Sequence, residues 1–65
     1  MTLEKLVEAY EQTYARRLYY TRLLSWKRAG VKLAENETYY KEKIEGLEFL
    51  EYKYLDKIEK EVNEA

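Results

Sequence analysis

The chain of 65 residues contains no cysteine, no histidine and no proline, and it has only two glycines. The absence of cysteine excludes disulfides and thiol nucleophiles, and the usual zinc sites also need cysteine or histidine. No imidazole is present to act as an acid or a base near neutral pH. Gly30 and Gly46 are too far apart to form a glycine-rich phosphate loop. We therefore expect no enzymatic activity, no cofactor and no metal site.

Long apolar stretches are missing as well, because no run approaches the ~18 residues that indicate a membrane span. The N-terminal segment MTLEKLVEAYE is acidic and amphipathic, which is unlike a secretory signal. These features predict a cytoplasmic protein that does not enter a membrane. Many Glu and Lys residues with few Asn and Gln also resemble the composition of hyperthermophile proteins, which suggests a thermostable chain.

The chain is also too short to form a large hydrophobic core. A domain of this size buries only ~60% of the surface that its unfolded chain exposes. Chains below about 70–80 residues usually need a further source of stability, such as disulfides, a metal or association with another chain. Since the composition removes the first two, oligomerisation is the source that remains.

The charges are unevenly distributed, although the net charge is only −1. Residues 1–11 sum to −2, residues 12–34 carry six positive charges and no acid, and residues 35–65 sum to −5. Such a separation favours either self-complementarity between copies or a basic surface for a partner.

Two segments with helical periodicity flank a single break near Gly30. We predict an all-α fold in which residues 1–65 form one helical hairpin, with a helix over about 3–29, a turn over about 30–35 and a helix over about 36–63. Thr2 and Asn36 are suitable N-caps for the two helices. Gly30 can take the left-handed conformation that follows a helix end, with Val31 folding back onto Trp26 in a Schellman motif.

A short connection makes the two helices antiparallel neighbours. One apolar stripe on each helix then matches the other in register, because residues that face each other should have a constant index sum. The predicted pairs, each of which sums to 65, are Leu3–Val62, Val7–Ile58, Tyr10–Leu55, Tyr14–Glu51, Leu18–Leu47, Thr21–Ile44, Ser25–Tyr40 and Arg28–Glu37.

Apolar and aromatic side chains remain outside this seam, and such exposed residues usually mark contact surfaces. Leu6, Tyr20 and Leu24 lie on one flank of the first helix, with Arg17 among them. An outward stripe of the first helix is basic and aromatic (Arg16, Tyr20, Leu23, Lys27), and that of the second is acidic and aromatic (Glu45, Phe49, Tyr52, Asp56, Glu59). We predict a homodimer, most simply a four-helix bundle, with self-association through Tyr20, Leu23, Leu24, Trp26, Phe49 and Tyr52.

The stretch YARRLYYTRLLSWKR, residues 14–28, also fits other roles, because it holds five positive charges and four aromatic rings. In a nucleic-acid binder, cations would neutralise phosphates and rings would stack on bases. The candidate contacts are Arg16, Arg22, Lys27, Lys32, Tyr19 and Tyr20. The charges point in several directions and no docking motif is present, so this role ranks second.

Two further readings stay open for the same residues. An adaptor or inhibitor would dock its aromatic face onto a larger protein. Alternatively, Arg17 and Arg28 simply pair with acids of the second helix, and the remaining side chains are solvated. Gly46 in mid-helix either permits a close helix approach or has no role.

Overall fold

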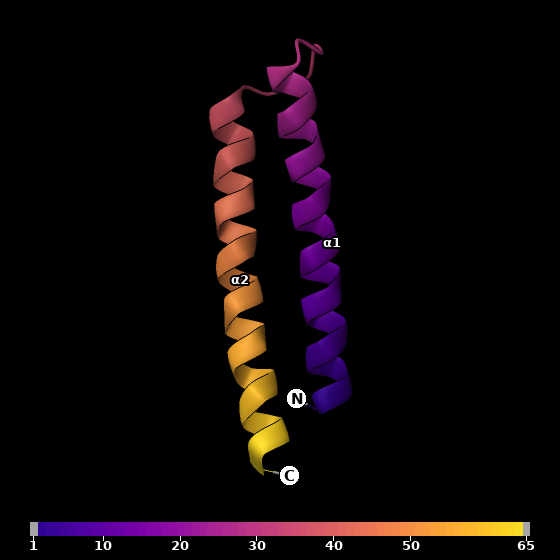
Figure 1. Ribbon diagram of the computed structural model, residues 1–65, viewed down its shortest axis with the longest axis vertical. Helices are drawn as coiled ribbons and strands as arrows, with labels where there is room; N and C mark the ends of the chain where they lie inside the picture. The colour runs from indigo at the N-terminus through magenta and orange to yellow at the C-terminus, as the bar shows by residue number, and fades with distance from the viewer. Residues whose placement is uncertain (1, 65) are drawn as a thin grey trace.

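The computed structural model describes residues 2–64, which form two helices and a connecting loop. Helix α1 spans Leu3–Arg28 and helix α2 spans Glu37–Glu64. The helices lie side by side and run in opposite directions, so both ends of the chain lie away from the loop (Figure 1). No strand occurs among the described residues, which confirms the predicted all-α hairpin.

Local hydrogen bonds explain where the helices begin and end. The Thr2 side chain caps α1 by accepting from the backbone N–H of Lys5 at 3.3 Å. At the other end Gly30 has a φ of 100°, and Val31 donates its N–H to the carbonyl of Trp26 at 3.0 Å. This is the predicted Schellman motif. Asn36 caps α2, because its side-chain oxygen accepts from the N–H of Tyr39 at 2.9 Å.

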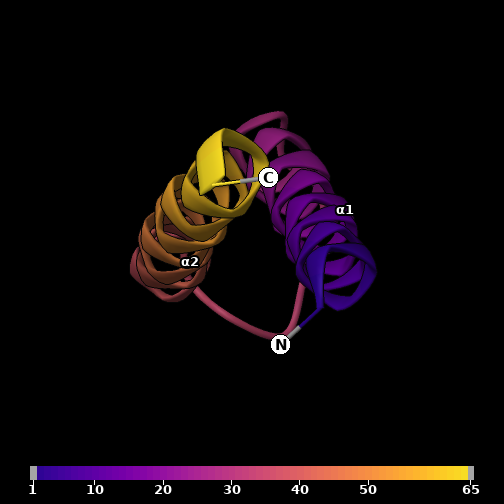
Figure 2. The same cartoon turned by 90° about the horizontal axis from the view of Figure 1, so that it is seen from below.

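The hairpin is a thin rod of 49 × 15 × 15 Å with a radius of gyration of 14.7 Å. A compact domain of 65 residues would have a radius of gyration of only about 11 Å. Seen from its end, the two helices are inclined to each other (Figure 2), and residues 2–64 contain no third element that could pack against them. Neither helix, within residues 2–64, combines the length and the apolar character needed to cross a membrane.

The stripe of α2 that faces α1 matches the prediction, except that Leu55 and Val62 are exposed. Tyr40 and Glu51 are buried. Ile44 and Leu47 between them, and Tyr54 and Ile58 beyond Glu51, are half-buried. Arg28 of α1 also meets Glu37 as predicted, with Arg28 Nε 3.0 Å from a carboxylate oxygen.

The predicted stripe of α1 is wrong. Leu6, Thr13 and Leu24 are the buried residues of this helix, and Arg17 pairs with Glu51 across the seam. The helix is therefore rotated by about 100°, one residue, from the predicted orientation. The pairs that place Leu3, Val7, Tyr14, Leu18, Thr21 and Ser25 in the core are incorrect, since all six side chains are exposed. The physical reason is that Glu51 of α2 is buried and needs a positive partner, which Arg17 supplies and Tyr14 does not.

Candidate interaction surface

The seam of the hairpin is only partly apolar. Its buried apolar side chains, among the described residues, are Leu6, Leu24 and Tyr40. Thr13 is also buried, and its hydroxyl donates to the carbonyl of Ala9 at 2.8 Å. Three apolar side chains make a small core for two helices of 26 and 28 residues.

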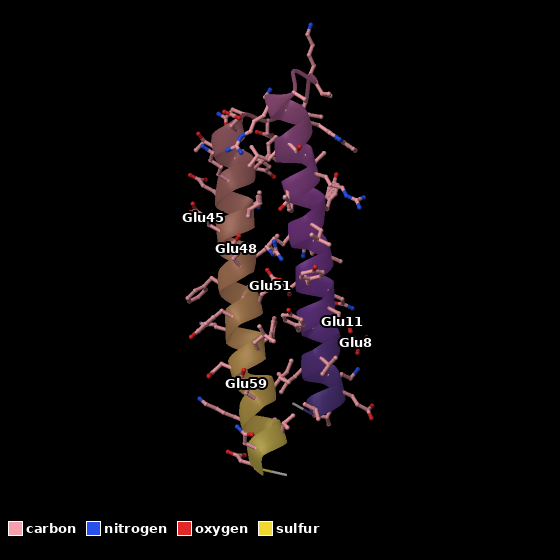
Figure 3. All side chains as sticks on the ribbon, viewed as in Figure 1. Glu8, Glu11, Glu45, Glu48, Glu51 and Glu59 are labelled. Carbon is pink, nitrogen blue, oxygen red and sulfur yellow. The ribbon has the colours of Figure 1, made fainter. Side chains whose placement is uncertain are left out.

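An ion pair occupies the centre of the seam. The Nε of Arg17 donates to a carboxylate oxygen of Glu51, whose side chain is 10% exposed while that of Arg17 is 24% exposed. Glu51 points from α2 into the space between the helices (Figure 3). The hydrogen bond to Glu51 raises the pKa of Arg17 above its ordinary value, so the guanidinium stays charged. The guanidinium carbon also lies 5.1 Å from the ring centre of Tyr14. This contact holds the Tyr14 side chain along the edge of the seam.

Beside the seam, α1 presents a second stripe that α2 leaves exposed except at Tyr10, which lines a hollow with Glu51 and Leu55. We call it the uncharged stripe, and its residues are Leu3, Val7, Tyr10, Tyr14, Leu18, Thr21 and Ser25. Its largest apolar members are between 37% and 41% exposed, apart from half-buried Tyr10. Tyr10 and Tyr14 stack along it with ring centres 6.3 Å apart. The stripe runs nearly the whole length of α1 without one charged side chain.

Charged residues border the uncharged stripe on its outer edge. Near the N-terminus, Glu4, Glu8 and Glu11 line a shallow hollow of about 410 Å³ together with Leu3 and Val7. Glu8 and Glu11 lie on the side of α1 that faces away from α2 (Figure 3). Towards the loop, the hollow next to Leu18 measures about 310 Å³ and is lined by Ala15, Leu18, Tyr19, Arg22, Leu23 and Trp26. The edge is therefore acidic in its first half and positive in its second.

The residues predicted to mediate self-association fall into different environments. Leu24 is 8% exposed and packs in the seam, so it is unavailable to a second chain in this conformation. Tyr20 and Leu23 are half-buried. Trp26, Phe49 and Tyr52 are exposed, with Tyr52 the most exposed at 75%. Lys53 Nζ lies 4.8 Å from the ring centre of Phe49, which places a positive charge over that ring.

Most of the candidate nucleic-acid contacts are divided between two hollows, which adjoin only where the rings of Tyr19 and Tyr20 meet edge to face with their centres 5.3 Å apart. Arg16 and Tyr20 line a hollow on one side of the hairpin with Glu42 and Lys43. Tyr19 and Arg22 line the separate hollow beside Trp26. Lys27 is half-buried and Lys32 lies in the loop. Two further cations of the basic segment, Arg17 and Arg28, already pair with glutamates of α2.

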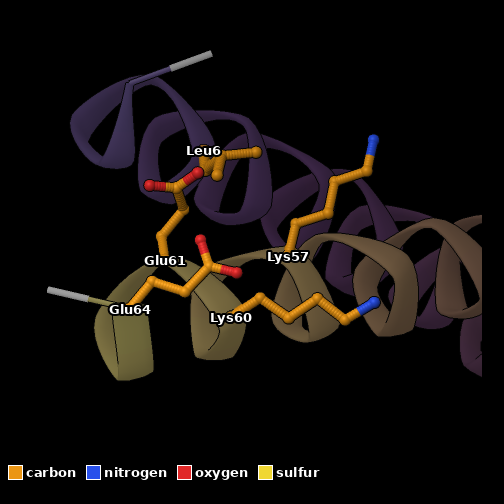
Figure 4. A pocket seen from close by; sticks show the side chains of 5 residues that line it. All are labelled: Leu6, Lys57, Lys60, Glu61 and Glu64. Atoms are coloured by element: carbon orange, nitrogen blue, oxygen red, sulfur yellow. The ribbon is translucent and has the colours of Figure 1, made fainter.

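A further hollow lies at the open end of the hairpin, beside Leu6. Lys57, Lys60, Glu61 and Glu64 of α2 complete its wall, around a volume of about 350 Å³. The carboxylates of Glu61 and Glu64 lie near Leu6, whereas the amino groups of Lys57 and Lys60 point away from them (Figure 4). Lys60 instead pairs with Asp56 at 3.1 Å. Charges of both signs on an open surface offer no convergent chemistry. Throughout residues 2–64, no cluster of acidic side chains is arranged to hold a metal ion.

The alternative interpretation, in which Arg17 and Arg28 pair with acids of the second helix, is confirmed. The predicted register nevertheless placed Tyr14 rather than Arg17 opposite Glu51, and it missed the exposure of the uncharged stripe. The available signal was Glu51, which interrupts the apolar stripe of α2 halfway along its length. A buried carboxylate needs a cation, and Arg17 is the arginine of α1 that lies opposite it. The opposite charges of the two halves of α1, in contrast, can be predicted from the sequence.

Comparisons with known proteins give no further guide to this surface. No family model, no curated protein and no solved structure matches the chain.

Proposed function

We propose that this chain is a small non-enzymatic module that associates with a second copy of itself, as a dimer of hairpins in a four-helix bundle. Its role is then structural or lies in protein–protein contact. The observation that carries the proposal is the uncharged stripe, which is exposed on α1 while the stripe containing Arg17 is buried. Apolar surface of this length is costly to leave in water, and contiguous apolar patches usually mark contact sites.

Surface area supports the same proposal. The hairpin exposes 5237 Å², whereas a compact monomer of 8.0 kDa exposes about 4,450 Å². The excess is close to the roughly 800 Å² that each partner buries in a stable protein–protein interface. A second copy laid along the rod therefore supplies the burial that this short chain lacks.

A second copy is favoured over an unrelated partner because the charges along α1 complement themselves. Acidic side chains border the stripe near the N-terminus, and Arg22 borders it towards the loop. The chain has no cysteine to supply a thiol nucleophile and no histidine to supply a neutral base. We therefore propose a binding role rather than a catalytic one.

The test is light scattering after size exclusion, at two salt concentrations, for the native chain and two variants. Leu18→Glu puts a charge into the uncharged stripe at a position that is already 38% exposed. We expect the native chain to elute as a dimer at micromolar concentration and Leu18→Glu to elute as a helical monomer. Phe49→Glu, on the outer face of α2, is the matched control and should stay dimeric.

The other outcomes each name a different function. A native chain that is monomeric at every concentration contradicts self-association and favours an adaptor that docks onto another protein. Dissociation by Phe49→Glu, with Leu18→Glu unaffected, moves the interface to the outer face of α2. If an added mixed-sequence oligonucleotide is bound at low salt and released at high salt, phosphate contacts are the main function instead.

A further inference from the structure

The uncharged stripe is symmetric about its central residue. Read from either end, its seven residues follow one another at intervals of 4, 3, 4, 4, 3 and 4, with Tyr14 in the middle. Two α1 helices that lie antiparallel about a two-fold axis at Tyr14 therefore bring stripe residue against stripe residue over the full length. The pairs are Leu3 with Ser25, Val7 with Thr21, Tyr10 with Leu18, and Tyr14 with its own copy.

The side-chain sizes in these pairs are complementary. The large residue Leu3 meets the small residue Ser25 at each end, and Val7 meets Thr21, which is of similar size. In a parallel arrangement, by contrast, each residue would face its own copy, so that small residues would meet small residues near the loop. Close packing of a helix interface favours alternation of large and small side chains across it. The antiparallel pairing provides that alternation at both ends.

The charges on the outer edge also favour antiparallel over parallel pairing. Antiparallel pairing brings Arg22 of one copy next to Glu4 and Glu8 of the other. Arg22 lies on one side of Tyr14 and the two glutamates lie on the other, at distances along the helix that differ by less than one turn. The acid-lined hollow beside Leu3 and Val7 then faces the hollow that holds Arg22 and Trp26. Parallel pairing about a two-fold axis would instead place the two outer edges on opposite sides of the interface, where Arg22 would face neither glutamate.

We propose that two copies of this chain pair through antiparallel α1 helices, with the two-fold axis beside Tyr14 and with Arg22 facing Glu4 and Glu8 of the other copy. The pairing rests on the proposed self-association and adds its orientation and register. Trp26 lies at the rim of this interface, where it covers the N-terminal end of the partner's stripe.

Single cysteines test the pairing directly, because the native chain has none. Three variants are made, Tyr14→Cys, Val7→Cys and Thr21→Cys, and each is oxidised in a buffer containing oxidised glutathione. A disulfide needs Cα atoms within about 7 Å of each other. We expect Tyr14→Cys to give a covalent dimer by itself. Val7→Cys should form one only when it is mixed with Thr21→Cys.

The contrary outcomes are separable from failure of the proposed function. If Val7→Cys cross-links to itself, the helices are parallel and the proposed orientation is wrong. If the native chain is dimeric by light scattering but none of the three variants cross-links, α1 does not pair with α1. A native chain that is monomeric at all concentrations overturns both the pairing and the self-association.

Charge reversal provides an independent check that leaves the stripe intact. Arg22→Glu should weaken the dimer about threefold to tenfold, because the side chain at position 22 is then negative and faces two glutamates of the partner. The combined variant Arg22→Glu with Glu4→Lys and Glu8→Lys should recover most of that loss, with the single tryptophan as a fluorescence reporter of assembly. The pairing is overturned if the combined variant is no tighter than Arg22→Glu alone.

Discussion

Two neighbouring stripes of α1 differ in burial, because one packs against α2 and the other remains exposed. The stripe that faces α2 contains Leu6, Thr13, Arg17 and Leu24, and it therefore buries a charge and a hydroxyl. The uncharged stripe, about one residue further round the helix, contains the more consistently uncharged side chains and remains exposed. Apolar content alone would have selected the opposite orientation. The orientation of α1 is instead set by α2, because α2 brings Glu51 to the centre of the contact.

The comparison shows how one buried carboxylate can orient a whole helix. An unpaired glutamate in the seam would be costly, whereas pairing with Arg17 satisfies both charges. Rotation of α1 to reach Arg17 leaves its uncharged stripe outside, where it becomes available to another chain. The feature that orients the hairpin is thus the same feature that produces its contact surface.

The largest difference between the stripes is expected when a leucine is truncated in each. Leu6 is 2% exposed, so Leu6→Ala should lower the free energy of unfolding by about 2–5 kcal/mol. Leu18 is 38% exposed, so Leu18→Ala should affect assembly more than the fold of the hairpin. Thermal unfolding at several protein concentrations measures both effects. Equal destabilisation by the two variants, independent of concentration, would contradict the orientation of α1.

A smaller effect is expected when the ion pair is broken. Arg17→Met alone leaves the Glu51 carboxylate without its partner and should cost about 1.5–3 kcal/mol in urea unfolding. The double variant Arg17→Met with Glu51→Leu should recover that loss or exceed the native stability, since an apolar pair of similar volume can replace a buried ion pair. If the double variant is less stable than Arg17→Met alone, the ion pair does not orient the helices as described.

The same pair should show little pH dependence through its arginine. The pKa of Arg17 is raised by its hydrogen bond to Glu51. A raised pKa means that this contribution is fully present below the ordinary arginine pKa and is lost only as pH rises through the higher folded-state value. Between about pH 6 and 9, Arg17 should therefore contribute a constant stability.

The smallest effects are expected when the two glycines are substituted, and these variants distinguish effects on folding from effects on assembly. Gly30→Ala forces a side chain into the positive φ at the end of α1 and should destabilise the hairpin by about 1–2 kcal/mol. Gly46 lies in mid-helix on the side of the hairpin that bears Arg16 and Tyr20, with nothing within 4 Å of an added methyl group. Gly46→Ala should therefore stabilise the fold by about 1 kcal/mol and leave the dimer unchanged. A weakened dimer would instead mean that Gly46 permits the close approach of another chain.

Much of this hairpin can be predicted from the sequence, because the decisive interactions join residues a few positions apart. Thr2, Gly30 and Asn36 mark helix ends through hydrogen bonds that span three to five residues. The stripe of α2 follows from the spacing of Tyr40, Ile44, Leu47 and Ile58, and the pairing of Arg28 with Glu37 follows from the short loop between them.

Only the tertiary structure decided which stripe of α1 faces α2. The two candidates are adjacent on the helix, and the uncharged stripe is the more apolar of the two, so apolar periodicity favours the wrong one. The choice depends on the contact between Arg17 and Glu51, which are 34 residues apart in the chain. The sequence by itself thus determined two helices, their ends and the inner face of α2. The rotation of α1, and with it the exposed uncharged stripe, required the two helices to be packed together, because burial of Glu51 is a property of the pair.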